Sequence, residues 1–97
     1  MHTRFSYDSE VDPARLVARC EKTGLNCIAV TDHNTIDGAL EVQRLAPFMV
    51  IIGEEVGSIS GEITGLFLRE TIPQGLSPLE TVERIKDQGG LVSIPHP

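Results

Sequence analysis

Hydrophobic residues recur along the chain in two patterns. Three segments space them three or four positions apart, as on one face of a helix: residues 12–24, 35–46 and 77–88. Four segments hold them in short continuous runs, as in buried strands: residues 26–31, 48–53, 62–68 and 91–94. Buried strands that alternate with helices indicate an α/β fold with parallel strands. The pattern is compatible with part of a barrel and with an open sheet.

Capping residues mark where two of these helices begin. Asp12 stands before Pro13, and Ser77 stands before Pro78 with Glu80 three residues after it. Asp and Ser side chains accept hydrogen bonds from the free N–H groups of a first helical turn, where proline also fits. Ser77 and Glu80 have the spacing of a capping box. We therefore predict helices that start at Pro13 and Pro78.

Polar residues that can bind metals follow three of the predicted strands. In chain order they are His33, the pair Glu54 and Glu55, and His96. A third histidine, His2, stands at the start of the sequence. In α/β folds the carboxyl ends of the strands gather reactive groups at one rim. Histidines and carboxylates that converge there suit zinc, manganese or iron, so the placement alone predicts a metal site.

Each of these residues also has a plainer interpretation. Asp32 is suited to cap the helix that begins near Thr35, and Glu54 with Glu55 to form a solvated pair. Glu62 fits a charge at a strand edge, and His96 between two prolines fits a rigid turn without chemistry. A lone histidine or glutamate at a strand end is more often solvated or hydrogen-bonded than a ligand. The argument for a metal therefore rests on their joint placement.

Composition and charge narrow the class of protein. The 97 residues carry a formal net charge of −6, which argues against nucleic-acid binding through a cationic surface. Phosphate substrates remain compatible, because metals held by carboxylates make a site locally positive. No apolar run is long enough to span a bilayer or to form a signal peptide, so a cytoplasmic protein without a membrane partner is expected. The two cysteines, Cys20 and Cys27, are expected to be reduced core residues.

Several segments together resemble the motifs of the PHP (polymerase and histidinol phosphatase) family of metal-dependent phosphoesterases. Thr31-Asp32-His33-Asn34-Thr35 resembles the second motif of the family, T-D-H followed by a small polar residue and Thr. The others, in chain order, are His2-Thr3, Arg4 to Ser9, Gly53-Glu54-Glu55 and Ser93-Ile94-Pro95-His96-Pro97. T-D-H alone is a weak signal, but the whole series in this order is specific. The first histidine of the H-x-H-T motif and the final D-x-H motif of the family have no counterpart in the 97 residues.

The resemblance implies a fold and a ligand set. The family fold is a distorted (β/α)7 TIM-like barrel, and residues 1–97 would form one partial PHP domain that lacks the first strand and the carboxyl-terminal part of the barrel. The family binds up to three divalent metals, for which zinc, manganese or iron is expected. Carried over by motif, the metal ligands would be His2, Asp8, His33, Glu55, Glu62 and His96.

The resemblance also implies roles outside the ligand set. Asp32 would orient its neighbours from behind the ligands. Arg4 and Arg69 lie near ligand segments and are candidates to contact a substrate phosphate, although a solvated surface arginine is the commoner case. The nucleophile would be a metal-bound hydroxide, since no serine or cysteine stands in a recognisable nucleophile setting.

The leading functional expectation is a stand-alone phosphoesterase. It would hydrolyse a small phosphorylated metabolite or a nucleotide. One alternative is a PHP module associated with a DNA polymerase, and another is a metal-binding fragment that does not catalyse a reaction. The sequence leaves the substrate and the oligomeric state open.

Overall fold

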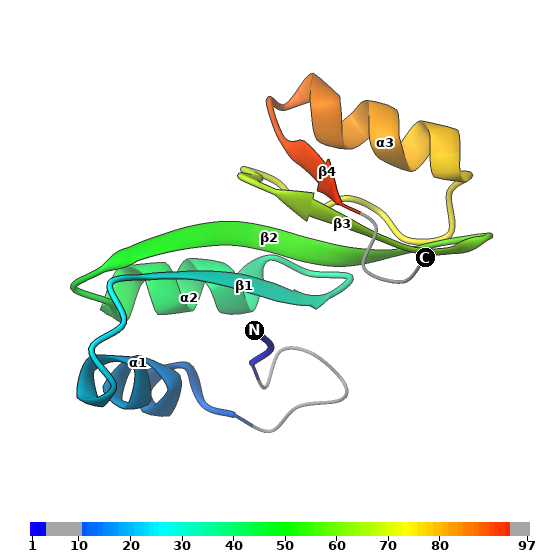
Figure 1. Ribbon diagram of the computed structural model, residues 1–97. Helices are drawn as coiled ribbons and strands as arrows, with labels where there is room; N and C mark the ends of the chain where they lie inside the picture. The colour runs from blue at the N-terminus through cyan, green and yellow to red at the C-terminus, as the bar shows by residue number, and fades with distance from the viewer. Residues whose placement is uncertain (4–10, 94–97) are drawn as a thin grey trace.

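The computed structural model describes residues 1–3 and 11–93, and Figure 1 shows their arrangement. The elements along the chain are α1 (Pro13–Lys22), β1 (Cys27–His33), α2 (Asp37–Leu45), β2 (Met49–Ser58), β3 (Gly61–Leu66), α3 (Pro78–Asp87) and β4 (Leu91–Ser93). This is the mixed α/β class that the hydrophobic pattern predicts. None of the helices in the described ranges is long and apolar enough to cross a membrane.

The strands form one sheet in the order β1-β2-β3-β4, and only part of it is parallel. β1 and β2 are parallel, as predicted, but β3 is antiparallel to both β2 and β4. The expectation of parallel strands throughout is therefore wrong for this part of the sheet. Only residues 59 and 60 separate β2 from β3, whereas a parallel crossover needs a dozen or more residues. The sheet and its three helices are compatible with a piece of a PHP domain.

The helices cover one face of the sheet. α2 packs on β1 and β2, and α1 packs on α2, around an apolar cluster that includes Val30, Val42 and Val50. α3 packs on β3 around a second cluster with Val56 and Ile85. Because side chains alternate along a strand, Val50 and Val56 share one face of β2. The intervening odd-numbered residues of β2 face the opposite side, away from the helices.

The first residues of the chain lie along the free edge of β1. The Met1 nitrogen donates to the Ala29 carbonyl at 2.8 Å, and the Thr31 nitrogen donates to the Met1 carbonyl at 2.7 Å. These two bonds on either side of Met1 follow the pattern of a parallel strand pair. They place residues 1–3 beside the end of β1 that carries His33.

The predicted helix starts are confirmed, and β2 is longer than predicted. Asp12 accepts a hydrogen bond from the Ala14 nitrogen, and Ser77 accepts one from the Glu80 nitrogen. β2 continues past Gly53, where the sequence suggested an end. A side chain at position 53 would lie 2.8 Å from the Gly65 carbonyl on β3, so this glycine permits a close approach of strands and does not stop one. Glu54 and Glu55 therefore lie inside β2.

The cysteines differ in environment. Cys20 on α1 is buried in the first apolar cluster, as predicted, whereas Cys27 at the start of β1 is exposed. The expectation of a core position is therefore wrong for Cys27. It faces the side of the sheet that the helices leave uncovered, because it alternates with the buried Ile28. Both thiols are free.

Candidate metal centre

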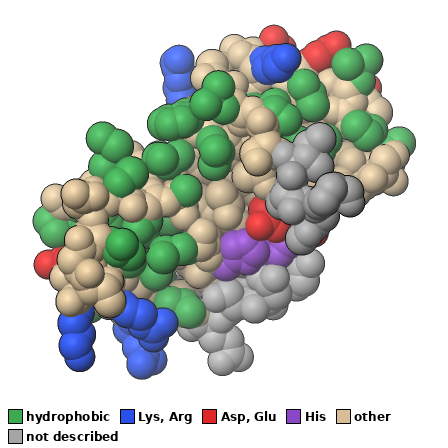
Figure 2. Space-filling view, in the orientation of Figure 1, with side chains coloured by type: hydrophobic (Ala, Val, Ile, Leu, Met, Phe, Trp, Pro, Cys, Tyr) green, Lys and Arg blue, Asp and Glu red, His purple; other side chains and the backbone are tan. Residues whose placement is uncertain are grey.

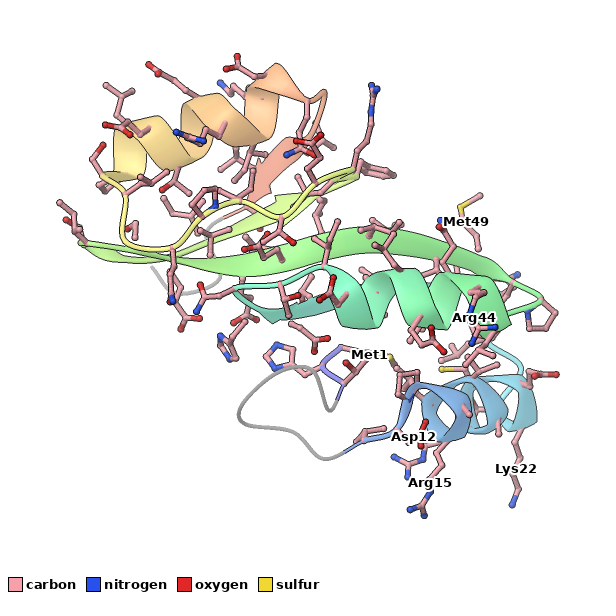
Figure 3. All side chains as sticks on the ribbon, turned by 180° about the vertical axis from the view of Figure 1, so that it is seen from behind. Met1, Asp12, Arg15, Lys22, Arg44 and Met49 are labelled. Carbon is pink, nitrogen blue, oxygen red and sulfur yellow. The ribbon has the colours of Figure 1, made fainter. Side chains whose placement is uncertain are left out.

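Two histidines and a glutamate meet on the uncovered face of the sheet. His33 is the last residue of β1, Glu55 is its direct partner on β2, and His2 comes from the segment beside β1. Figure 3, seen from behind, labels Met1 next to β1 and so locates that segment. One ligand atom from each of these residues lies within 4.8 Å of the others. Figure 2 shows histidine and acidic side chains adjoining on the surface there.

Glu55 connects the two imidazoles. Its Oε1 lies 3.0 Å from Nε2 of His2, and its Oε2 lies 3.4 Å from Nδ1 of His33. The rings of His2 and His33 stand nearly perpendicular, with centroids 4.7 Å apart. Each oxygen of one carboxylate thus faces a different histidine, so Glu55 would be able to hold a divalent ion together with either imidazole.

Glu62 adds a second carboxylate at His33. Its Oε2 lies 2.8 Å from Nδ1 of His33. Glu62 is on β3 opposite Gly57, two positions from the Thr64–Glu55 pair, so it projects from the same face as Glu55. The His33 nitrogen therefore faces two carboxylates, which is favourable only when it donates a proton or shares a cation with them.

Burial of these four side chains is graded. The His33 side chain is 9% exposed and that of Glu55 16%, whereas His2 and Glu62 are 25% and 34% exposed. The inner pair is held firmly by its surroundings, and the outer pair borders solvent. Neutral imidazole nitrogens and carboxylate oxygens form a donor set suited to zinc, manganese or iron. The described residues therefore fit a divalent cation that a small molecule can approach from the solvent side.

Asp32 does not cap α2. The residue before that helix is Ile36, and no side chain caps it. Instead both oxygens of Asp32 accept hydrogen bonds from Thr3, one from its backbone nitrogen and one from its hydroxyl at 2.5 Å. Both residues are fully buried. The interpretation of Asp32 as a helix cap is thus wrong. Asp32 instead binds Thr3 on the face of the sheet opposite to the histidines.

Glu54 is not part of a solvated pair. Its side chain is fully buried on the helix-covered face, because alternation turns it away from Glu55. Its Oε1 accepts a hydrogen bond from the Ile72 nitrogen at 2.7 Å, while Oε2 has no partner among the described residues. Burial raises the pKa of Glu54 to about 7, and the Ile72 hydrogen bond partly opposes this rise. Glu54 belongs to the interior of the domain rather than to the metal centre.

The comparison with known proteins agrees with this geometry. The sequence profile of the PHP domain matches residues 1–89 of the chain. The chain belongs to the PHP family. PHP domains generally bind divalent metals and are generally hydrolases. The possible His and Glu site of this PHP domain is therefore of a kind that its family uses.

Two relatives from Methanocaldococcus jannaschii have names that assign no activity. An uncharacterized protein of Methanocaldococcus jannaschii, MJ1587, is 48% identical over 93 residues, which are 93% of this chain and 54% of that protein. A second uncharacterized protein of the same organism, MJ0417, is 41% identical over 69 residues, 71% of this chain and 26% of that protein. The PHP chain described here thus spans about half the length of the first relative and about a quarter of the second.

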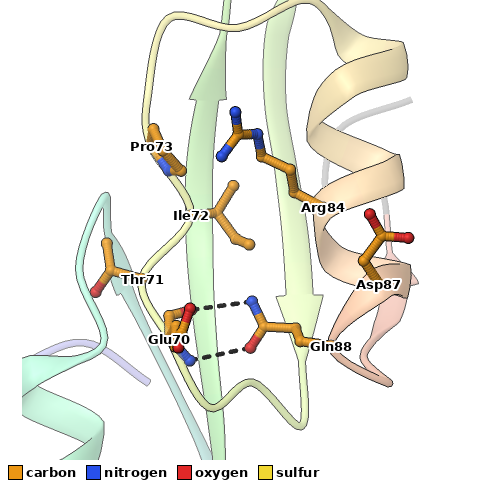
Figure 4. Close-up of a pocket in the computed structure, with 7 residues that line it drawn as sticks. All are labelled: Glu70, Thr71, Ile72, Pro73, Arg84, Asp87 and Gln88. Carbon is orange, nitrogen blue, oxygen red and sulfur yellow. Dashed lines mark hydrogen bonds between the residues drawn. The ribbon is translucent and has the colours of Figure 1, made fainter.

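Arg69 lies beside the end of α3. Its backbone nitrogen and that of Glu70 both donate to the side chain of Gln88 at the end of α3, and Figure 4 shows the Glu70–Gln88 pair at the rim of a cavity of about 260 Å³. The Arg69 guanidinium comes within 3.9 Å of the place of a Cβ at Gly89. This location gives no support to a phosphate contact. Arg4, Asp8 and His96 lie outside the described residues, so their predicted roles stay predictions.

Two residues next to the candidate ligands were not assigned a role from the sequence. Thr3 is the buried partner of Asp32. Asn34 has a positive φ of 58° and turns the chain directly after His33. Its nitrogen donates to the Glu55 carbonyl at 3.0 Å, and its Oδ1 accepts from the Gly57 nitrogen at 2.8 Å. Asparagine tolerates this left-handed conformation better than most residues. An asparagine directly after His33 was therefore a sequence signal for a turn at this position.

Proposed function

We propose that this PHP domain binds divalent metal ions at His2, His33, Glu55 and Glu62 and hydrolyses a phosphate ester. The substrate class would be a small phosphorylated metabolite or a nucleotide. One observation supports this most directly: the two oxygens of Glu55 face different histidines, at 3.0 and 3.4 Å. Because the chain spans about half of its first relative, the activity of the whole protein is part of the proposal.

The residues of the chain would divide the work in a simple way. His2 and His33 would offer neutral nitrogens, and Glu55 would offset the charge of the bound ions while it spaces them. Bound divalent ions supply Lewis-acid activation of water and of the phosphoryl oxygens at neutral pH. Glu62 would hold the His33 side of the centre and harden its metal preference, since carboxylate oxygens favour harder ions than nitrogen does. Asp8 and His96 are proposed as further ligands by family motif.

The charge of the protein favours a compact substrate. With a net charge of −6, the surface outside the centre would repel a polynucleotide backbone more than one small phosphate ester. A cytoplasmic location would supply such esters. The net charge supports the phosphatase over a polymerase-associated module.

The test combines metal content with turnover. The purified chain would be stripped with a chelator, reloaded with Zn²⁺ or Mn²⁺, and assayed by elemental analysis and with an aryl phosphate. We expect bound metal and hydrolysis in the wild type, and loss of both in His33→Ala and Glu55→Gln. Glu21→Gln, on the exposed side of α1, is the matched control and should behave as the wild type.

The outcomes separate the two readings of the domain. Metal binding without hydrolysis would favour the non-catalytic metal-binding alternative. Hydrolysis that survives both site substitutions would contradict the assignment of the centre, because the activity would then come from elsewhere in the chain or from a contaminant.

A further inference from the structure

Three neighbouring extended segments each pair a candidate ligand with a buried polar residue. The pairs are His2 with Thr3, His33 with Asp32, and Glu55 with Glu54. Successive residues of an extended chain point to opposite faces, so the ligands share the uncovered face and their neighbours share the helix-covered face. The strand register confirms this arrangement for β1 and β2, because Asp32 pairs with Glu54 and His33 pairs with Glu55.

The contact between Thr3 and Asp32 joins the segments that carry the histidines. Asp32 accepts from both the nitrogen and the hydroxyl of Thr3, so its two oxygens hold one residue at two points. Both side chains have no exposed surface. Hydrogen bonds to a buried carboxylate are strong and are costly to leave unmade, so this contact resists sliding of the first segment along β1.

α2 closes directly over this contact at Gly38. A Cβ at position 38 would collide with both the Asp32 carboxylate and the Thr3 hydroxyl. Gly38 lies in the first turn of α2 and is itself buried. The glycine therefore leaves the space that the Thr3–Asp32 pair occupies, and the three residues form one packed unit.

Register decides whether the two histidines can meet. A shift of the first segment by one residue would turn His2 to the opposite face. Two backbone bonds at Met1 join this segment to β1, and the Thr3 contact with Asp32 adds a fixed point on the other side of His2. His2 is thus held between a backbone pairing and a buried hydrogen-bond pair.

We propose that Thr3, Asp32 and Gly38 form a positioning lock that sets the placement of His2 relative to His33 and thereby the affinity of the centre for metal. The lock deepens the proposed function and rests on it for the metal. Its residues touch neither cation nor substrate, and they act through the two histidines. Residues that orient metal ligands from behind change metal affinity by roughly 10–100-fold when they are lost.

The experiment compares Thr3→Val, which removes the hydroxyl at nearly constant volume, with Thr3→Ser, which keeps it. Calorimetric titration of the chelator-stripped chain with Zn²⁺ should show roughly 10–100-fold weaker binding in Thr3→Val and about wild-type binding in Thr3→Ser. Asp32→Asn, which loses one acceptor, should weaken binding in the same direction and serves if Thr3→Val does not fold. Val42→Ala, a buried change on α2 one turn after Gly38, controls for general loss of stability.

A readout without metal separates the lock from the proposed function. In the metal-free chain the ring centroids of His2 and His33 lie 4.7 Å apart, so their ring protons should give a nuclear Overhauser effect. We expect this effect in the wild type, Thr3→Ser and Val42→Ala, and its loss in Thr3→Val or Asp32→Asn. An effect that persists in both lock variants, or zinc binding that Val42→Ala weakens as much as they do, would overturn the lock. A wild type that shows the effect but binds no metal would instead refute the proposed function alone.

Discussion

Nδ1 of His33 and Oε2 of Glu62 lie 2.8 Å apart although their strands are not neighbours in the sheet. β2 runs between β1 and β3, and the residue of β2 that pairs with Glu62 is Gly57. Glu62 projects from the same face as Glu55, so its side chain reaches across β2 to His33. The antiparallel β2–β3 hairpin is what brings this carboxylate to the centre.

Removal of the Glu62 charge should weaken metal binding at the centre without unfolding the domain. Glu62→Gln keeps the shape of a half-exposed side chain but removes a full negative charge beside the bound ion. We expect about tenfold weaker Mn²⁺ binding, and a smaller loss for Zn²⁺, because manganese depends more on carboxylate oxygen. Calorimetric titration with both metals measures this.

Glu83→Gln on exposed α3 is the control. Equal affinities of Glu62→Gln and the wild type for both metals would show that Glu62 is only a hydrogen-bond partner of His33.

Asn34 should be replaceable only by residues that keep its backbone conformation. Asn34→Ala loses the hydrogen bond to Gly57 and forces alanine into a positive φ, which together should cost about 2 kcal/mol of unfolding free energy. Asn34→Gly loses the same hydrogen bond without the steric penalty and should cost about 1 kcal/mol. Urea denaturation of the metal-free chain measures both. A glycine variant less stable than the alanine variant would contradict the conformational argument.

Stability should fall with pH through the titration of Glu54. Its folded pKa of about 7 lies above the ordinary 4.5, so between these values the folded state holds a proton that the unfolded state has lost. Unfolding free energy should therefore decrease as the pH rises from about 4.5 to 7 and then level off. The pKa difference corresponds to about 3 kcal/mol.

Glu54→Gln should remove this dependence. The variant and the wild type should be similarly stable at pH 4.5, with the variant more stable above pH 7. The difference between the two unfolding curves isolates Glu54, since all other titratable groups are the same in both chains. A difference that does not change with pH would contradict a raised pKa.

The sequence predicted the helices and one face of the site better than it predicted the sheet. Asp12 and Ser77 accept hydrogen bonds from backbone nitrogens no more than three residues further along the chain. The two helix starts therefore depend on local sequence and could be predicted from it. Gly53 was interpreted as the end of a strand. The contact that requires a glycine there is with the Gly65 carbonyl on another strand, and the local sequence does not indicate it. β3 is antiparallel to β2 because only residues 59 and 60 link the two strands. The predicted strands, 48–53 and 62–68, left a longer gap that concealed this hairpin.

The candidate site divides in the same way. His33 and Glu55 were found because they belong to short motifs at strands, and the structure pairs them directly. Thr3 was not assigned a role because its partner Asp32 is 29 residues away, and nothing local in a Thr codes for that contact. Arg69 was selected for being near Glu62 in sequence, and in the structure its backbone nitrogen bonds to Gln88 at the end of α3, so its phosphate contact stays a prediction.

The central claim is that a divalent ion binds between His2, His33 and Glu55. The most direct test is a crystal structure of the zinc-loaded chain with anomalous data collected above and below the zinc edge. The account predicts an anomalous peak within coordination distance of the His2 and Glu55 side chains or of the His33 and Glu55 side chains, and its absence in Glu55→Gln crystals grown in the same zinc concentration. Zinc peaks that lie only elsewhere on the protein would contradict it.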